Sequence, residues 1–203
     1  MMGQRVKKLS VEMTMSIYDK VGSTYDSMRN TVGVKDIINE VEALGKSIKV
    51  LDLGCGTGHP IAKTVSPIVQ LYCGIDNSQP MLNKYLVNVP NAYCRFLDMP
   101  KIDQLPGDWD LIFSWGSICH LPIESQKKTM ITVSKLLKPE GRFLFTSGPE
   151  ADECTGKVGK YTVFHHSMGK QAYTELLREQ NMELIDAKFS EGNFYVYRFR
   201  KNT

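Results

Sequence analysis

Residues 50–58 read Val-Leu-Asp-Leu-Gly-Cys-Gly-Thr-Gly, and this stretch decides the fold. The run from Val50 to Leu53 is apolar with one acid, which is typical of a buried parallel strand that ends near solvent. Gly54, Gly56 and Gly58 then leave the backbone without Cβ atoms, so a ligand can lie against the peptide planes. A strand, a glycine-rich turn and a helix start together predict a nucleotide-binding crevice at the carboxyl end of a sheet.

The segments around this turn alternate between helix and strand. Apolar residues recur with helical spacing over 34–44 and predict an amphipathic helix that ends at Gly45. Pro60 favours a short helix that ends before Pro67. Further strands are predicted at 71–75, 92–97, 110–115 and 142–146, and further helices at 80–86, with Ser78 as its cap, and at 123–137. This order predicts a parallel sheet with right-handed crossovers.

The last quarter of the chain breaks the alternation. A helix is predicted over 170–180, with Ser167 as its cap, and two strands follow at 183–189 and 194–200. Only residues 190–193 separate these strands, and so short a link requires an antiparallel hairpin. The expected fold is therefore α/β: a doubly wound, mostly parallel seven-stranded sheet with a C-terminal antiparallel hairpin and helices on both faces.

Composition sets further bounds. The chain has 203 residues, of which 42% are hydrophobic and 23% charged, as in ordinary globular domains. A net charge of +3 is too mild for a dedicated nucleic-acid binder. No apolar stretch is long enough for a membrane span, and no secretory signal opens the sequence. The five cysteines form no CxxC pair, which predicts reduced thiols in a cytoplasmic protein.

Two glycine fingerprints compete at the turn. The dinucleotide pattern G-x-G-x-x-G needs a glycine where His59 stands. The pattern D-x-G-x-G-x-G, from Asp52 to Gly58, instead resembles motif I of the class I S-adenosylmethionine (SAM) methyltransferases. The terminal hairpin favours the same family, because a dinucleotide-binding half would continue with a parallel strand. An enzyme that uses NAD is the less favoured alternative.

Residues after the second strand support an adenosine ligand. Asp76 follows that strand at the place where a carboxylate accepts hydrogen bonds from two ribose hydroxyls, a requirement that SAM and NAD share. Met81, one turn into the next helix, can cover one face of adenine. The alternatives are a helix-capping role for Asp76 and plain core packing for Met81.

The resemblance extends from about Tyr18 to Lys201, and the chain is most similar to small uncharacterised bacterial members of that family. It implies SAM as cofactor and S-adenosyl-L-homocysteine as product. Family-like segments are Asp98-Met99, Trp115-Gly116-Ser117 with His120-Leu121, Phe145 to Pro149, and His165 to Met168. The cofactor-binding residues that it implies are Asp52, Gly54, Cys55, Gly56, Gly58, Asp76, Asn77, Met81, Asp98, Met99, Ser114, Trp115, Tyr18 and Tyr25. The chain departs from the pattern at His59, where relatives often carry an acid.

The resemblance also implies a domain organisation. Residues 1–203 are expected to form a single methyltransferase domain, with a Rossmann-like core over 46–203. Residues 1–30, with Tyr18-Asp19 and Tyr25-Asp26, resemble the N-terminal lid that these enzymes fold over SAM.

Methyl transfer requires little covalent chemistry from the protein, because the sulfonium group of SAM is already a strong electrophile. The enzyme must align a nucleophile in a dry pocket, and it needs a base only for a protonated acceptor. His120 and His165 are the candidate catalytic residues, since both are expected in loops at the carboxyl edge of the sheet; a structural role is the alternative for each. Cys119, His120, His165 and His166 have the donor atoms of a metal site, but Cys119 and His120 are adjacent and no second cysteine pair exists, so no metal is expected.

The sequence therefore predicts a cytoplasmic SAM-dependent methyltransferase that transfers a methyl group to a small molecule by in-line SN2 displacement, mainly through positioning. It leaves no room for an appended recognition domain, which disfavours nucleic acid as a partner. Methylation of RNA or protein, and SAM binding without catalysis, remain as alternatives. A monomer or a homodimer is expected, without attachment to a membrane.

Overall fold

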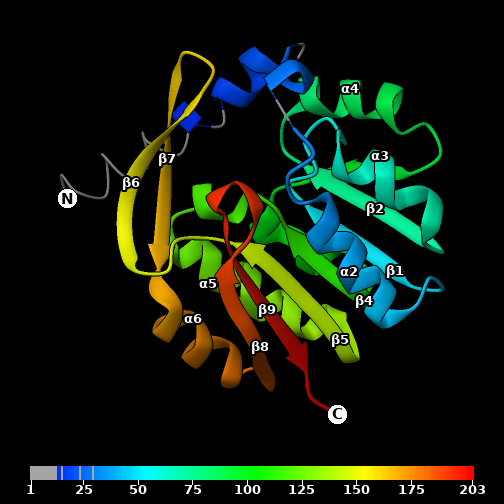
Figure 1. Cartoon of the computed structure of the whole chain (residues 1–203), viewed down its shortest axis with the longest axis vertical. Helices are drawn as coiled ribbons and strands as arrows, with labels where there is room; N and C mark the ends of the chain where they lie inside the picture. The colour runs from blue at the N-terminus through cyan, green and yellow to red at the C-terminus, as the bar shows by residue number, and fades with distance from the viewer. Residues whose placement is uncertain (1–12, 15, 23, 29) are drawn as a thin grey trace.

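The structure is a computed structural model, and it describes residues 13–14, 16–22, 24–28 and 30–203. A seven-stranded sheet with the order β3-β2-β1-β4-β5-β9-β8 crosses the molecule (Figure 1). Its strands are β1 (Lys49–Leu53), β2 (Leu71–Asp76), β3 (Tyr93–Phe96), β4 (Trp109–Ser114), β5 (Leu137–Thr146), β8 (Met182–Phe189) and β9 (Tyr195–Lys201). The seven strands predicted from the sequence are thereby confirmed.

Strand direction follows the lengths of the connections. β1 pairs in parallel with both β2 and β4, and β2 with β3 and β4 with β5 are parallel as well. β9 is antiparallel to both β5 and β8. For β8 and β9 the reason is the short link 190–193, which cannot carry the chain back to a parallel start. The strand order reverses between β1 and β4, and this switch point is where ligands bind in open α/β sheets.

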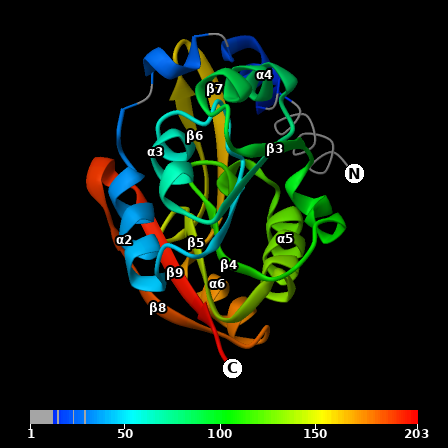
Figure 2. The same cartoon turned by 90° about the vertical axis from the view of Figure 1, so that its right-hand side faces the viewer.

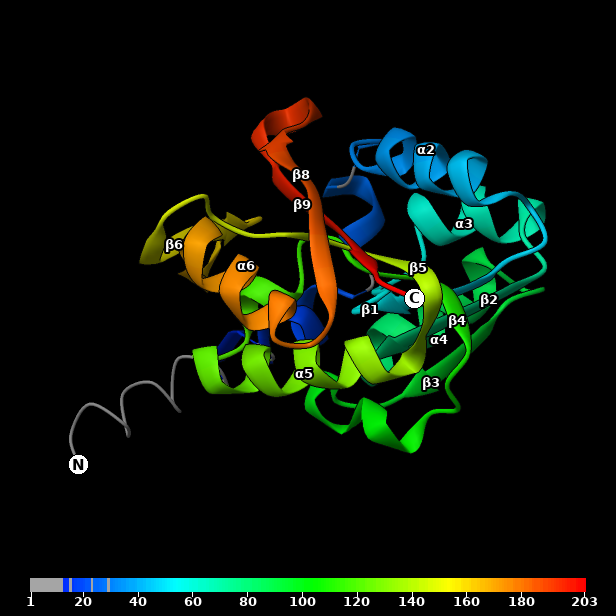
Figure 3. The ribbon, with the colours of Figure 1, turned by 90° about the horizontal axis from the view of Figure 1, so that it is seen from below.

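Helices cover both faces of the sheet, as predicted. α2 (Val34–Leu44), α3 (Ile61–Val65) and α4 (Gln79–Asn88) contribute to one apolar core, while α5 (Ile123–Leu136) and α6 (Gly169–Arg178) contribute to the other. Figures 2 and 3 show α2 and α5 on opposite sides of the sheet. Ser78 caps α4, since its hydroxyl accepts a hydrogen bond from the Met81 N–H at 3.5 Å.

Short 3-10 helices complete the connections. They are η1 (Tyr25–Met28), η2 (Ser66–Ile68), η3 (Met99–Gln104), η4 (Ile118–His120) and η5 (Glu191–Asn193). η4 follows the carboxyl end of β4 and η3 follows that of β3, so both lie at the edge of the sheet that carries the glycine turn. Within the part of the chain that the structure describes, no helix has the length and apolar character of a membrane span.

A two-stranded antiparallel ribbon, β6 (Ala151–Val158) and β7 (Tyr161–Met168), lies apart from the main sheet and was not predicted. It rises beside the N-terminal segment in Figure 1. His165 is therefore on a strand, and its expected place in a loop is wrong. β6 is largely exposed, so its sequence lacks the alternation of apolar and polar residues that reveals a strand packed on one face.

Candidate functional site

A cavity of about 360 Å³ lies at the carboxyl ends of β1, β2 and β4. It is lined by the glycine turn, the ends of these strands, η3, η4 and the N-terminal segment. Of the residues predicted to bind a cofactor, those that line it are Tyr18, Tyr25, Asp52, Gly54, Cys55, Gly56, Gly58, Asp76, Asn77, Met81, Asp98, Met99 and Trp115. The fold therefore brings to one place residues that are far apart in the sequence.

Ser114 is the predicted binding residue that does not line the cavity. Its side chain is fully buried, donates a hydrogen bond to the Leu53 carbonyl at 3.0 Å, and accepts one from the Ile118 N–H at 3.0 Å. Ser114 therefore joins the end of β1 to η4 beneath the cavity. This arrangement gives it a structural role in the described chain.

The glycines of the turn differ in what they face. A Cβ at Gly54 would lie 2.0 Å from the Ser117 hydroxyl, and one at Gly58 would lie 2.6 Å from Val89. Both positions also have positive φ angles, of 82° and 75°, so packing and backbone conformation together require glycine there. A Cβ at Gly56 would meet nothing closer than Tyr25 at 3.9 Å. Of these three cavity-lining glycines, Gly56 is thus the one with free space around its Cα atom.

Asp76 holds the glycine turn to the end of β2. Its Oδ2 accepts a hydrogen bond from the Gly56 N–H at 2.9 Å, and its Oδ1 accepts one from the Ser78 N–H at 2.9 Å. Burial raises the pKa of this carboxyl, and the backbone hydrogen bonds oppose that rise. Each carboxylate oxygen has a second lone pair, so the group keeps acceptor capacity toward the cavity.

Asp98 lies at the neighbouring strand end. Its Oδ1 accepts a hydrogen bond from Asn77 Nδ2 at 3.1 Å, and its Oδ2 lies 2.7 Å from Lys101 Nζ. The hydrogen bond from Lys101 lowers the pKa of Asp98. This carboxyl is therefore an anion at neutral pH, and it can accept a hydrogen bond from an amine donor in the cavity.

Asp52, the acid inside β1, is only 4% exposed. The Tyr72 hydroxyl donates a hydrogen bond to its Oδ2 at 2.8 Å. Burial is the main cause that raises the pKa of Asp52 to about 7, and the bond from Tyr72 opposes it. The floor of the cavity therefore holds a carboxyl that changes its charge near neutral pH.

The N-terminal segment closes one side of the cavity, with Tyr18 and Tyr25 in its wall. Asp19 accepts a hydrogen bond from the Ser78 hydroxyl at 2.6 Å. Asp26 accepts from the Thr57 hydroxyl and, at 2.9 Å, from Asn88 Nδ2. Both acids thus bind the segment to the rim of the cavity, while the tyrosines next to them face the cavity.

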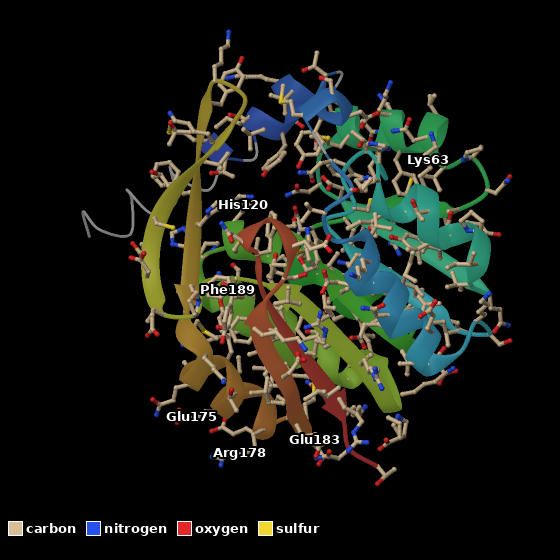
Figure 4. All side chains as sticks on the ribbon, in the orientation of Figure 1. Lys63, His120, Glu175, Arg178, Glu183 and Phe189 are labelled. Atoms are coloured by element: carbon tan, nitrogen blue, oxygen red, sulfur yellow. The ribbon has the colours of Figure 1, made fainter. Side chains whose placement is uncertain are left out.

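His120 also lines the cavity, between the ribbon and the edge of the sheet (Figure 4). Its Nδ1 lies 2.8 Å from the Phe164 carbonyl oxygen, and its Nε2 lies 2.7 Å from the Tyr18 hydroxyl. A carbonyl can only accept, so Nδ1 carries the proton and Nε2 accepts the Tyr18 O–H. Burial lowers the pKa of His120 to about 4, which keeps this imidazole neutral.

His165 does not line the cavity, but its ring packs against that of His120, with the centroids 4.8 Å apart. Burial lowers the pKa of His165 too. The catalytic roles predicted for His120 and His165 stay predictions. The geometry separates the two residues, because only His120 reaches the cavity directly.

Several lining residues were not predicted as binding residues from the sequence, and Thr14 and Ser117 are two of them. Thr14 lines the cavity and accepts a hydrogen bond at 3.2 Å from the Phe164 N–H of the ribbon. Ser117 lines it beside Gly54. The short spacing from Trp115 to His120 was a usable signal for Ser117, whereas nothing in the mixed pattern before residue 18 marks Thr14.

Comparisons with known proteins agree with this geometry. Residues 50–141 match the model of a family described as a methyltransferase domain. A phosphoethanolamine N-methyltransferase of Plasmodium falciparum is 26% identical, over 85% of this chain and 65% of the relative. An mRNA cap guanine-N(7) methyltransferase of Eremothecium gossypii is also 26% identical, over 73% of this chain and 39% of the relative. The chain thus spans less than two thirds of the length of these curated relatives.

The fold comparison covers nearly the whole chain. The structure of a SAM-dependent methyltransferase from Clostridium acetobutylicum superposes with a TM-score of 0.72 at 16% identity, and covers 92% of this chain and all of that one. The matched domain and this fold confirm the resemblance predicted from the glycine turn and the terminal hairpin.

Proposed function

We propose that this chain, which has the fold of the class I SAM-dependent methyltransferases, transfers a methyl group from SAM to a small-molecule acceptor. The observation that carries the proposal is one cavity lined by two chemically different groups of residues. The first group is the bare Gly56 backbone with the carboxyls of Asp76 and Asp98, and the second is Tyr18 with His120.

The first group of residues, Gly56 with Asp76 and Asp98, fits the cofactor. Gly56 leaves room for a ligand against the peptide plane, Asp76 keeps acceptor capacity for ribose hydroxyls, and Asp98 is an anion that accepts from an exocyclic amine. Met81 and Met99 supply apolar walls beside them. SAM bound there supplies an electrophilic methyl group on a sulfonium. The chain itself has to orient the acceptor and exclude water.

Tyr18 and His120 are suited to orient an acceptor. Because the Tyr18 proton is donated to His120 Nε2, the phenol oxygen acts toward any further group only as an acceptor. An acceptor N–H or O–H that binds this oxygen has its position fixed, and its proton has a path through Tyr18 to the His120 imidazole. His120 is held for this role by the Phe164 carbonyl.

A small acceptor is supported by how the cavity is closed. Asp19 and Asp26 bind the N-terminal segment to the core at Ser78 and Thr57, beside the two tyrosines in the cavity wall. A segment held this way limits the access of a large polymer. The two curated relatives act on phosphoethanolamine and on an mRNA cap by their names, so RNA remains the rival acceptor class. A cytoplasmic location and a monomer or homodimer stay predictions.

The test is a transfer assay with radiolabelled SAM and a panel of acceptors. The panel holds small amines, phenols and phosphoethanolamine, with capped RNA and unfolded protein as the rivals. We expect label in one of the small molecules. Transfer to RNA or protein alone would reassign the acceptor, and SAM binding without any transfer would favour a binding protein.

The Tyr18→Phe variant then tests the orienting pair. We expect its kcat to fall by about 100-fold, with SAM affinity within about twofold of the unaltered chain. Tyr93→Phe is the matched control, because Tyr93 is 70% exposed on the edge strand β3. Equal kcat values for the two variants would remove Tyr18 from the reaction.

A further inference from the structure

A cluster of soft and borderline donor atoms lies behind the wall that His120 forms. Cys119, His120 and His165 each offer one ligand atom, and these atoms lie within 4.8 Å of one another. Cys119 and His120 come from η4, and His165 comes from β7 of the ribbon. The sequence argument against a metal was that Cys119 and His120 are adjacent and that no second cysteine pair exists. The ribbon, which was not predicted, brings His165 to these two residues.

The orientation of His120 matches that of a metal ligand. Its Nδ1–H is donated to the Phe164 carbonyl, and metal-bound histidines generally hold their second nitrogen in this way. The Nε2 lone pair is thereby directed to the side of the ring where Tyr18 now donates. A metal ion at Nε2 and the Tyr18 hydroxyl therefore compete for one lone pair.

The ribbon also fixes the position of the His165 ring. A Cβ at Gly156 would lie 2.7 Å from the Cε1 atom of His165, so the absence of a side chain there gives the ring its place. Cys154 is paired directly with His165 across the ribbon, and cross-strand partners share one face. Cys154 is thus on the same face of the ribbon as His165.

We propose that Cys119, His120 and His165 form a binding site for a zinc-class divalent ion, with Cys154 as the fourth ligand, and that the bound ion displaces Tyr18 from His120. Thiolate and imidazole donors are those that Zn²⁺ selects. Ligand atoms of a tetrahedral zinc lie about 3.5 Å apart, so the widest separation must shorten by about 1 Å.

Binding of the ion makes and breaks the following bonds. The Cys119 and Cys154 thiols each lose a proton to solvent as the metal–sulfur bonds form. The Nε2 lone pair of His120 binds the metal, and its hydrogen bond from the Tyr18 hydroxyl is lost. The inhibitory effect of the ion rests on the proposed function, whereas its binding does not.

The site is tested with Co²⁺ as a spectroscopic probe and Zn²⁺ as a competitor, on the full chain after removal of metal. We expect one Co²⁺ per chain, thiolate-to-metal charge-transfer absorption, the visible bands of tetrahedral cobalt, and their loss when Zn²⁺ is added. Cys119→Ala and His165→Gln are each expected to weaken Co²⁺ affinity by more than about tenfold. Cys94→Ser is the matched control, because Cys94 lies on β3 and outside the cluster.

An activity measurement separates the metal site from the proposed reaction. Zn²⁺ should inhibit methyl transfer reversibly in the unaltered chain, and Cys119→Ala should keep basal activity while it resists the ion. Absence of thiolate bands with Co²⁺, or bands that survive in both Cys119→Ala and His165→Gln, would overturn the site. Bands in a chain that shows no methyl transfer would leave the metal site in place and contradict the proposed function instead.

Discussion

At the scale of single residues, Asp76 has two tasks. It faces the cavity as the predicted ribose acceptor, and it also receives the backbone N–H groups of Gly56 and Ser78. The carboxylate therefore positions the glycine turn before any ligand arrives.

For Asp76→Ala we expect SAM affinity to fall by about 1.5–3 kcal/mol, because hydrogen bonds to a charged acceptor are lost. The unfolding free energy should also fall by about 1–3 kcal/mol, since two backbone donors lose their partner. Calorimetric titration and urea unfolding measure the two effects. Asp103→Ala, at an exposed position on η3, is the control, and unchanged SAM affinity in Asp76→Ala would refute the ribose site.

Asp52 makes stability depend on pH. Its pKa is about 7 in the folded chain against an ordinary value of 3.8. As pH rises through this interval, the unfolded chain loses a proton that the folded chain keeps, so stability is lost up to about pH 7. An asparagine can still accept the Tyr72 hydroxyl and has no proton to lose.

Asp52→Asn should therefore gain stability relative to the unaltered chain as pH rises, by roughly 2–3 kcal/mol between pH 5 and pH 8. Urea unfolding of both proteins at the two pH values measures this difference. Asp103→Asn should show no such trend. A difference between Asp52→Asn and the unaltered chain that is the same at both pH values would mean that Asp52 titrates normally.

At the scale of elements, buried charges join α2 to the C-terminal hairpin. Arg198 on β9 forms ion pairs with Asp36, with Glu40 at 3.1 Å and with Asp186 at 3.0 Å. Asp36 and Glu40 are 7% and 4% exposed. A second arginine, Arg142, reaches Glu40 at 2.8 Å. The helix that precedes the glycine turn is thus held to the antiparallel end of the sheet.

Arg198→Met should lower the unfolding free energy by about 3–5 kcal/mol, because it leaves two buried carboxylates with incomplete compensation. Urea unfolding measures the loss. Lys188→Met is the matched control: Lys188 also pairs with Asp186, but its side chain is 66% exposed, so a change within about 1 kcal/mol is expected. Equal losses for the two variants would show that burial does not govern these pairs.

The elements also show where sequence reasoning works and where it stops. The central strands β1 and β4 are largely buried, so their apolar runs reveal them, and the short link 190–193 reveals the direction of the terminal hairpin. The ribbon has no such signal, because β6 packs little of its surface. The sequence feature that could have predicted this hairpin is the turn at Gly159, which has a φ of 56° and stands between residues that favour β-strands.

At the scale of the whole molecule, the cavity joins predictable and unpredictable parts. The glycines, Asp76 and Asp98 could be found because strand ends of a parallel sheet meet at one edge. The hydrogen bond between Tyr18 and His120 joins residues 102 apart in sequence. The hydrophobic periodicity of a sequence predicts helices and strands, but it does not predict a contact between such distant residues. The same holds for His165, which reaches His120 only through the ribbon.

The central claim is that the cavity binds SAM. A thermal-shift comparison of SAM, S-adenosylhomocysteine, NAD and no ligand tests it most directly. A ligand at a hundredfold excess over its Kd adds about 2.7 kcal/mol, which for a chain of this size raises Tm by roughly 5–10 °C. We predict this shift with SAM and S-adenosylhomocysteine and none with NAD. A shift with NAD alone, or with none of the three, would contradict the account.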